Sequence, residues 1–499
     1  MQSKLYLILI LLLALFLRCF DLSNNPPELN SDELINFASA HSIVETGADL
    51  HGKLLPYFTD KAVEMRPPIY GYATLVSTLI MGENTSSIRA PAVFFGLLSI
   101  FAVYLLGMEF FRDRRAALMA AFLMTIVPWH IHFSRVGWEP ASFLPFLLFS
   151  IYFFLHGVNS SKRTLVALSF ALFTLTIYTY HAAPLYAFLF LFSLFLLNFR
   201  YFIKEKKLFV ICILIAAILA IPYIWTASTE YLMYARAKSI NTFKDGLNTE
   251  SISLFASNYI SHFGLEYLFI SGDPNLKFVS GAGVLYWIML PLILFGVIGL
   301  WFCDLPRKHK ILIVIWILIY PLAGSLTNDG VPHAARTLVG SAMFCLLSGF
   351  GYSVIYRFVI SHTELTALDY VFSVSIVFIS LLSLGYFANF YYFHYPNASY
   401  LHWDYGQKQI FSNIQQLEHE YKLACMGNLN HPNNRQLLYY YLRDSKLDIT
   451  KNLDDSRCRE SGTIIVQKHY EPRIDRSMQL VDIVKGPDEK ALYHIYVIE

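Results

Sequence analysis

Charged residues are scarce in this sequence. Only 15% of the 499 residues are Asp, Glu, Lys or Arg, whereas soluble domains carry about 25%. Cysteine is scarce too, with six residues in the chain. They are scattered without a C-x-x-C pair, which leaves zinc and haem sites without support. The net charge is only +2 and no long basic block is present, so nucleic-acid binding is not favoured. This composition excludes a soluble globular enzyme, a disordered chain and a disulfide scaffold.

Several enzyme motifs are also missing from the sequence. It contains no Gly-rich phosphate loop, no nucleophile elbow and no H-E-x-x-H, so nucleotide-binding and hydrolase functions have no support. What the chain has instead is hydrophobicity, since 56% of its residues are hydrophobic and 16% are aromatic. The class that remains is a polytopic membrane protein.

Apolar runs of membrane-spanning length recur along the chain. A transmembrane helix needs about 20 mainly apolar residues. The run 164–199 is too long for one helix, and His181 and Pro184 at its centre predict two helices that meet at a turn. The first run lacks a small-residue cleavage site, which predicts a retained helix. The runs are 5–20, 67–82, 89–110, 116–131, 140–157, 164–199, 208–228, 284–303, 311–326, 337–356 and 370–392.

Basic residues in the short loops predict the orientation, because cytoplasmic loops are enriched in Lys and Arg. Placing all the basic clusters in the cytoplasm requires that 67–82 and 89–110 together cross the membrane once. The result is 11 crossings in a plasma or cytoplasmic membrane, with a cytoplasmic N-terminus and outer loops at 21–66 and 229–283. The clusters are Lys4, Arg112–Arg115, Lys162–Arg163, Arg200–Lys207, Arg307–Lys310 and Arg357.

The composition changes at about residue 394, where polar residues become frequent. We therefore predict a membrane domain over 1–393 and a small extracytoplasmic α/β domain over 394–499. Two cysteines, Cys425 and Cys458, lie in the second domain, and the sequence leaves open whether they pair. The expected strands are Lys422–Met426, Thr463–Val466 and Tyr493–Ile498, and the expected helices are Gln409–Tyr421 and Arg435–Arg443.

Polar residues gather at the outer ends of the apolar runs, where polar groups are costly and mark function. Asn30 and Glu33 form a capping box that predicts an amphipathic helix lying on the membrane. Taken alone, Asp32 and Glu33 are explained by their negative charge, which stabilises the N-terminus of a helix. The other clusters, each with an ordinary interfacial explanation of its own, contain Glu64 and Arg66, Arg135 and Glu139, His181, Asp273, and His333 and Arg336.

These clusters share one face, and together they suit one chemistry. A carboxylate can deprotonate an acceptor hydroxyl, while Arg and His can hold a phosphate leaving group. The order of the motifs resembles the GT-C membrane glycosyltransferases, and more narrowly the protein O-mannosyltransferase and lipid A aminoarabinose transferase superfamily. Over residues 1–393 the matching elements are Asp32-Glu33, Arg66-Pro67-Pro68-Ile69-Tyr70 with Arg in place of the family's Lys, Ser134-Arg135 with Glu139, Asp273-Pro274-Asn275, and Pro332-His333 with Arg336.

The resemblance implies a helical membrane fold with about 11 to 13 transmembrane helices and an inverting transfer from a polyprenyl-phosphate sugar. Asp32 would be the general base, and Glu33 and Glu139 would orient the acceptor or a bound ion. Family members often have Asp where this chain has Glu139. Metal use varies in the superfamily, so a divalent metal stays open and no other cofactor is implied. The implied phosphate ligands are Arg66, Arg135, His181, His333 and Arg336. Glu64 and Asp273 are further possible site residues, with no role assigned.

Other interpretations remain open. Trp403-Asp404-Tyr405-Gly406 is similar to part of an oligosaccharyltransferase motif, with His402 replacing its first Trp, but is equally typical of an aromatic belt. A transporter or flippase of lipid-linked glycans should show charged positions in mid-span and internal repeats, and the sequence has neither. A catalytically silent scaffold is the third alternative. The sugar, the acceptor (protein, lipid or glycan) and the oligomeric state cannot be inferred from the sequence.

Overall fold

Helices dominate the computed structural model, which describes residues 2–61, 64–278, 280–362, 366–426, 440–442, 445, 447–450, 453–471 and 478–498. Among these residues, six helical segments are long and apolar enough to cross a membrane. The predicted polytopic helical architecture is thus confirmed. The six are α4 (Thr85–Phe111), α7 (Pro140–Asn159), α11 (Lys206–Thr229), α15 with α16 (Arg307–Ile319 and Leu322–Ser325), Val339–Phe358 in α17 (Val339–His362), and Tyr370–Trp403, which begins in α18 (Thr366–Asn389).

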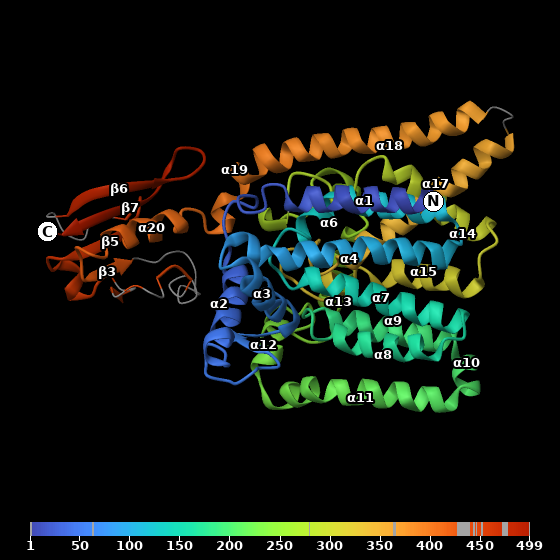
Figure 1. Cartoon of the computed structure of the whole chain (residues 1–499), viewed down its shortest axis with the longest axis horizontal. Helices are drawn as coiled ribbons and strands as arrows, with labels where there is room; N and C mark the ends of the chain where they lie inside the picture. The colour runs from blue at the N-terminus through green and yellow to red at the C-terminus, as the bar shows by residue number, and fades with distance from the viewer. Residues whose placement is uncertain are drawn as a thin grey trace.

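Each of the eleven apolar runs contains a helix, and most of these helices run side by side along the long axis in Figure 1. The break predicted within 164–199 is confirmed, because one helix ends at Thr176 and the next begins at Ala183. The remaining helices of the bundle are α1 (Gln2–Cys19), α5 (Arg114–Ile126), α8 (Arg163–Thr176), α9 (Ala183–Leu197), α10 (Phe199–Lys204) and α14 (Met289–Phe302).

The runs 67–82 and 89–110 form helices of unequal length. Helix α3 (Pro68–Met81) has 14 residues and α4 has 27. At 1.5 Å per residue α3 is about 21 Å long, shorter than the roughly 30 Å hydrocarbon core. It lies beside α2 (Ser31–Thr46) at the end of the bundle nearest the C-terminal sheet (Figure 1). This arrangement supports the prediction that the two runs cross only once, and Figure 1 places the N-terminus and the sheet at opposite ends.

Glycines allow α14 and α17 to pack backbone against backbone in the bundle core. A Cβ atom on Gly351 would lie 1.8 Å from the carbonyl oxygen of Leu292, and one on Gly296 would lie 2.2 Å from that of Leu347. Small residues at a helix interface permit this close approach in membranes. Any larger residue at Gly351 would push the two helices apart.

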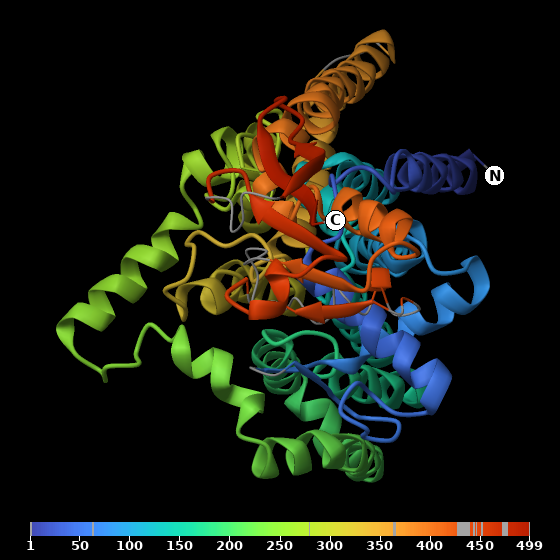
Figure 2. The ribbon, with the colours of Figure 1, turned by 90° about the vertical axis from the view of Figure 1, so that its left-hand side faces the viewer.

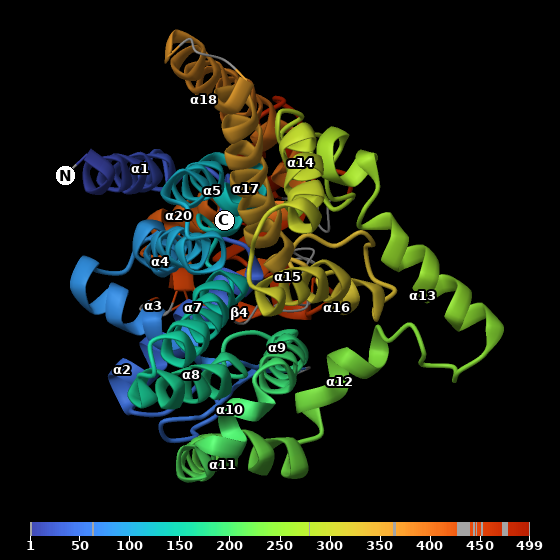
Figure 3. The same cartoon turned by 90° about the vertical axis from the view of Figure 1, so that its right-hand side faces the viewer.

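Short elements join the long helices of the bundle. Strand β1 (Thr59–Lys61) pairs antiparallel with β2 (Glu64–Arg66), so that Thr59 lies opposite Arg66. Figures 2 and 3 show α12 (Leu232–Ser239) and α13 (Thr249–Ser261) standing out from the side of the bundle. The other short helices here are α6 (Pro128–Phe133), the π-helix Glu266–Ile270, the 3-10 helix Leu276–Phe278, the π-helix Phe390–His394, α19 (Tyr395–Ser399) and the 3-10 helix Tyr400–Trp403.

A mixed five-stranded sheet ends the chain, with strand order β4-β3-β5-β7-β6. The predicted strands overlap β3 (Leu423–Met426), β5 (Thr463–Lys468) and β7 (Ala491–Ile498). The first predicted helix overlaps α20 (Gln407–Leu417), which ends four residues before the predicted end at Tyr421. The sequence did not predict β4 (Asp448–Thr450) or β6 (Gln479–Lys485). The predicted helix Arg435–Arg443 lies outside the described residues except for 440–442. A disulfide joins Cys425 to Cys458, the pairing that the sequence left open.

The C-terminal domain packs on α2. One hydrophobic cluster contains Leu34 and Phe37 of α2 together with Ile410 and Phe411 of α20. Buried positions surround α2, and even its polar residues Asn36, Ser39 and His41 are covered. The prediction that this helix is amphipathic and lies on the membrane is therefore wrong, because the C-terminal domain, α3 and α4 cover the faces expected to meet water and lipid.

Candidate active site

The capping box at the start of α2 sets the position of Asp32. The side-chain oxygen of Asn30 accepts hydrogen bonds from the backbone N–H of Asp32 at 2.8 Å and of Glu33 at 3.2 Å. Glu33 Oε2 accepts in return from the N–H of Asn30 at 3.1 Å. The predicted capping box is confirmed, and it fixes the first turn of the helix.

Arg66 brings two of the predicted carboxylates together. Its Nη1 donates to Glu139 Oε1 at 2.7 Å, and its Nη2 donates to Asp32 Oδ1. The side chains of Arg66 and Glu139 are 5% and 9% exposed, whereas that of Asp32 is 35% exposed. Three segments distant in sequence thus converge on one guanidinium, and Asp32 is the carboxylate of the group that solvent can reach.

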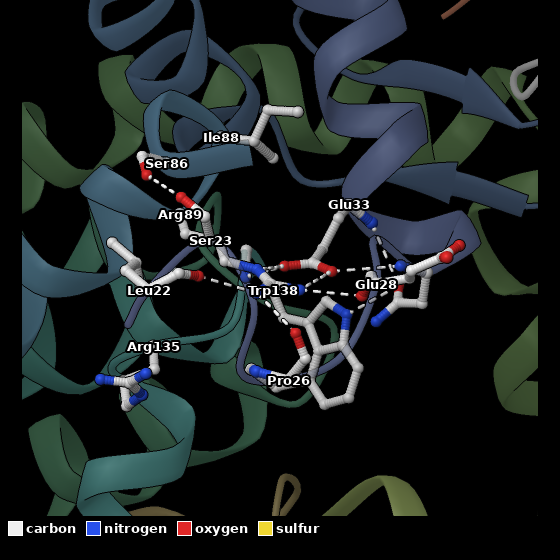
Figure 4. A network of polar contacts seen from close by, with 12 residues as sticks. Leu22, Ser23, Pro26, Glu28, Glu33, Ser86, Ile88, Arg89, Arg135 and Trp138 are labelled. Carbon is white, nitrogen blue, oxygen red and sulfur yellow. Dashed lines mark hydrogen bonds and ion pairs between the residues drawn. The ribbon is translucent and has the colours of Figure 1, made fainter. Parts of the chain in front are cut away.

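Glu33 faces the other way, into the protein. Its carboxylate is fully buried and accepts from Arg89 Nε at 2.8 Å, from Arg89 Nη2 at 3.2 Å and from the N–H of Gly137 at 2.9 Å (Figure 4). Both oxygens are therefore occupied by the protein. This geometry does not support the prediction that Glu33 orients the acceptor. Glu33 instead joins the start of α2 to Arg89 and Gly137.

Arg89 is a site-forming residue that the sequence analysis missed. Besides Glu33, its guanidinium donates to the carbonyl oxygens of Leu22, Pro26 and Glu28 at 2.8–2.9 Å (Figure 4). It thereby holds the loop that leads into α2. An arginine at the head of the apolar run 89–110 was the available signal, because a charge there is costly unless it is paired.

Arg135 has a different role from the one predicted. It is fully buried, and its two Nη atoms donate to four carbonyl oxygens at 2.8–3.2 Å, all between Leu17 and Asn25. These contacts hold the end of α1 and the following turn. The predicted contact of Arg135 with a donor phosphate is not supported, since those donors are directed at the backbone.

A second group of predicted residues surrounds the head of α17. Asp273 Oδ2 accepts from the N–H of Ala334 at 2.6 Å, and His262 Nε2 accepts from the N–H of His333 at 3.2 Å. The sequence analysis missed His262. Arg336 donates to Thr327 Oγ1 at 2.7 Å and pairs with Asp329 at 3.2 Å. The side chain of Arg336 is 12% exposed.

Aromatic contacts connect the two groups. Trp138, which precedes Glu139, has its ring 5.4 Å from that of Phe278, and Phe278 lies 4.9 Å from the ring of His333. Trp138 also donates to Asn30 Oδ1 at 3.0 Å, and its ring stacks on Trp403 at 5.5 Å. The Trp403-Asp404-Tyr405-Gly406 segment therefore begins directly against the site.

Two of the predicted site residues are not part of either group. His181 is exposed in the turn between α8 and α9, and that turn touches the start of α7, because Ser142 Oγ donates to the carbonyl of Thr179 at 3.4 Å. Glu64 lies in β2, but its side chain is outside the described part of the chain. Within that part, no three His, Cys, Asp or Glu side chains are grouped as metal ligands.

Two outer carboxyl groups have raised pKa values. Burial raises the pKa of Asp273 to about 7, although the N–H donors of Ala334 and Asn275 oppose this shift. Burial likewise raises the pKa of Glu28 to about 7. The carboxylate of Glu28 accepts from the N–H of Gly406 at 3.0 Å and thereby joins the first outer loop to the start of α20. Both groups link separate outer segments.

These shifts predict a stability that falls as the pH rises. The folded chain retains both protons up to about pH 7, whereas the unfolded chain releases them near the ordinary values of 3.8 and 4.5. Folding therefore takes up protons between about pH 4 and 7, and stability is lost across that window. The melting temperature of the detergent-purified protein should decline from pH 4.5 to 8. Glu28→Gln and Asp273→Asn should each flatten the decline, and unchanged profiles in both variants would contradict the assignment.

Comparisons with known proteins concern one segment of the sequence and the fold. Residues 65–225 match the family described as dolichyl-phosphate-mannose-protein mannosyltransferase, and no curated protein matches the chain. The apo oligosaccharyltransferase of Archaeoglobus fulgidus is 12% identical with a TM-score of 0.59, over 93% of this chain and 69% of that one. ArnT from Cupriavidus metallidurans bound to undecaprenyl phosphate is 14% identical with a TM-score of 0.55, over 98% and 97%.

A third similar structure is the A. fulgidus oligosaccharyltransferase AglB in complex with an inhibitory peptide and a dolichol-phosphate. It is 13% identical with a TM-score of 0.55, over 90% of this chain and 64% of that one. The predicted resemblance is confirmed by the matched segment and by the shared fold. Residues 65–225 are thus similar to the dolichyl-phosphate-mannose-protein mannosyltransferase family, and the chain shares the fold of the ArnT and oligosaccharyltransferase structures.

Proposed function

We propose that the chain transfers a sugar from a polyprenyl-phosphate donor to an acceptor hydroxyl, with inversion, on the extracytoplasmic face. The observation that carries this proposal is the partly exposed Asp32 held beside Arg66 and Glu139 at the outer end of the bundle. The similar ArnT structure contains undecaprenyl phosphate, and the AglB structure contains a dolichol-phosphate. A donor of the same lipid-phosphate class suits a chain whose site lies at the head of apolar helices.

The reaction is a single displacement. The Asp32 carboxylate takes the proton of the acceptor hydroxyl, and the hydroxyl oxygen forms a bond to the anomeric carbon of the sugar. The bond from that carbon to the phosphate oxygen breaks, and the polyprenyl phosphate leaves with the electron pair. In this proposal Arg66 and Arg336 stabilise the developing charge, and attack opposite the leaving group inverts the anomeric carbon.

The orientation of the protein in the membrane is part of the same proposal. We assign residues 1–393 to the membrane catalytic domain and 394–499 to an outer domain. Disulfides persist in oxidising compartments outside the cytosol, so the Cys425–Cys458 bridge supports an outer location of the sheet. The basic loops then face the cytoplasm, in agreement with the positive-inside rule.

A transfer assay in liposomes tests the function. The purified chain would be reconstituted and incubated with a radiolabelled polyprenyl-phosphate sugar and an extract of envelope lipids, glycans and proteins. Movement of label from the donor lipid into a second product is expected. Label that stays on the lipid but crosses the bilayer would instead identify a flippase, the main alternative.

Arg336→Ala is expected to weaken use of the donor. Loss of one charge-assisted contact to a phosphate, worth about 1.4 kcal/mol or more, should raise the KM for the donor about tenfold or more. The KM for the acceptor should change little. Arg336→Lys is the matched control that keeps the charge. The melting temperature of each variant shows whether loss of the contact with Asp329 has destabilised the protein, as distinct from a loss of donor binding. An unchanged donor KM would remove Arg336 from the phosphate site.

A further inference from the structure

Arg66 holds two carboxylates at once. Nη1 donates to Glu139 Oε1 at 2.7 Å, and Nη2 donates to Asp32 Oδ1. Nη1 also approaches the carbonyl oxygen of Asp32 at 3.4 Å. With a 5% exposed side chain, the guanidinium is largely withdrawn from water, so its interactions with charged partners are strong.

The residue type matters for this arrangement. A guanidinium presents several N–H donors in a rigid plane and can hold two acidic groups on different nitrogens. A lysine ammonium is a single point charge on a flexible stem. Arg66 can therefore hold both carboxylates on separate nitrogens, which a lysine could not do in the same way.

The clamp opposes the role of Asp32 as a base. A carboxylate that is paired with a guanidinium accepts a proton less readily. A phosphate also binds an arginine through paired, charge-assisted hydrogen bonds. An anionic donor arriving at this site therefore competes with Asp32 for the same nitrogen atoms.

We propose that Arg66 is shared between Asp32 and the donor phosphate, so that donor binding releases Asp32 to act as the base. This inference rests on the proposed function. It makes Arg66 a positioning residue that imposes an order on the reaction, because the acceptor hydroxyl is deprotonated only after the donor is in place. By linkage, the Asp32–Arg66 pair must weaken donor binding by the same factor by which the donor weakens the pair.

A double-mutant cycle on lipid binding tests the sharing. Undecaprenyl phosphate, without a sugar, would be titrated into the full-length protein in detergent for the wild type, Asp32→Asn, Arg66→Gln and the double variant. Asp32→Asn should bind the lipid phosphate about tenfold more tightly, a magnitude typical of coupled sites. Arg66→Gln should bind it more weakly. In the Arg66→Gln background, Asp32→Asn should give no further gain.

The cycle separates sharing from simple charge repulsion. If Asp32 merely repels the phosphate, its removal tightens binding equally with and without Arg66, and the proposal is overturned while the proposed function stands. Glu45→Gln is the matched control, because it removes a negative charge from the far end of the same helix and should leave lipid binding unchanged. Absence of lipid binding in every variant, with normal melting temperatures, would overturn the proposed function itself.

Discussion

Asp32→Asn is expected to insert and fold normally but to transfer sugar about 100 to 10,000 times more slowly, the range that a general base supplies. Asparagine has the volume of aspartate and keeps an acceptor oxygen for Arg66, but it cannot take up the acceptor proton. The measurement is the initial rate of transfer of radiolabelled sugar in liposomes at saturating donor. Because the variant is also expected to bind the donor lipid more tightly, a slow rate cannot be attributed to an empty site.

Glu45→Gln serves as the control for this rate as well. Both variants remove one negative charge from α2, but Glu45 lies at the end of the helix remote from Arg66 and pairs with His41 at 3.0 Å. Its transfer rate should stay within about twofold of the wild type, because Glu45 is exposed and its contact with His41 does not touch the site. Near-normal turnover by Asp32→Asn would remove Asp32 as the base.

Arg89→Met is expected to destabilise the protein more than any other single substitution discussed. It leaves Glu33 charged and fully buried without its partner, and breaking a buried ion pair in this way costs about 3–5 kcal/mol. It also releases the carbonyl oxygens of the loop before α2, including that of Glu28. The expected result is a lower melting temperature together with a reduced transfer rate, because Asp32 follows that loop directly.

A second variant keeps this prediction testable if Arg89→Met does not accumulate. The pair Glu33→Met and Arg89→Met removes both charges and should be more stable than Arg89→Met alone, since apolar replacement of a whole buried pair is often neutral. Melting temperatures of the two proteins decide the matter. Equal or lower stability of the double variant would show that the ion pair is not the source of the effect.

Local sequence patterns predicted the helices well. Helix formation in a membrane depends on long apolar runs, and the break at His181 and Pro184 could be seen in the sequence itself. The capping box of Asn30 and Glu33 was equally visible, because it operates over three residues. The short strands β4 and β6 were missed, since both are largely exposed and neither alternates clearly between polar and apolar residues.

The roles of charged residues depended on distant partners, which one sequence does not reveal. Asp32 and Glu33 are neighbours, but the helical turn directs one toward solvent and the other toward Arg89, 56 residues away. Arg135 and Arg66 both looked suited to phosphate, yet Arg135 lies among backbone carbonyls and Arg66 lies between carboxylates. The expected exposure of α2 failed for the same reason, because the domain that covers it lies at the other end of the chain.

The contact between the C-terminal domain and α2 affects the order in which parts of the protein fold as it is synthesised. Leu34 and Phe37 pack among residues that are synthesised after every membrane helix is complete. The apolar surface of the helix that carries Asp32 therefore stays uncovered until the end of the chain has left the ribosome and folded. A prematurely ended chain would contain all of its membrane segments and every proposed site residue, and would still lack the support that holds its base in place.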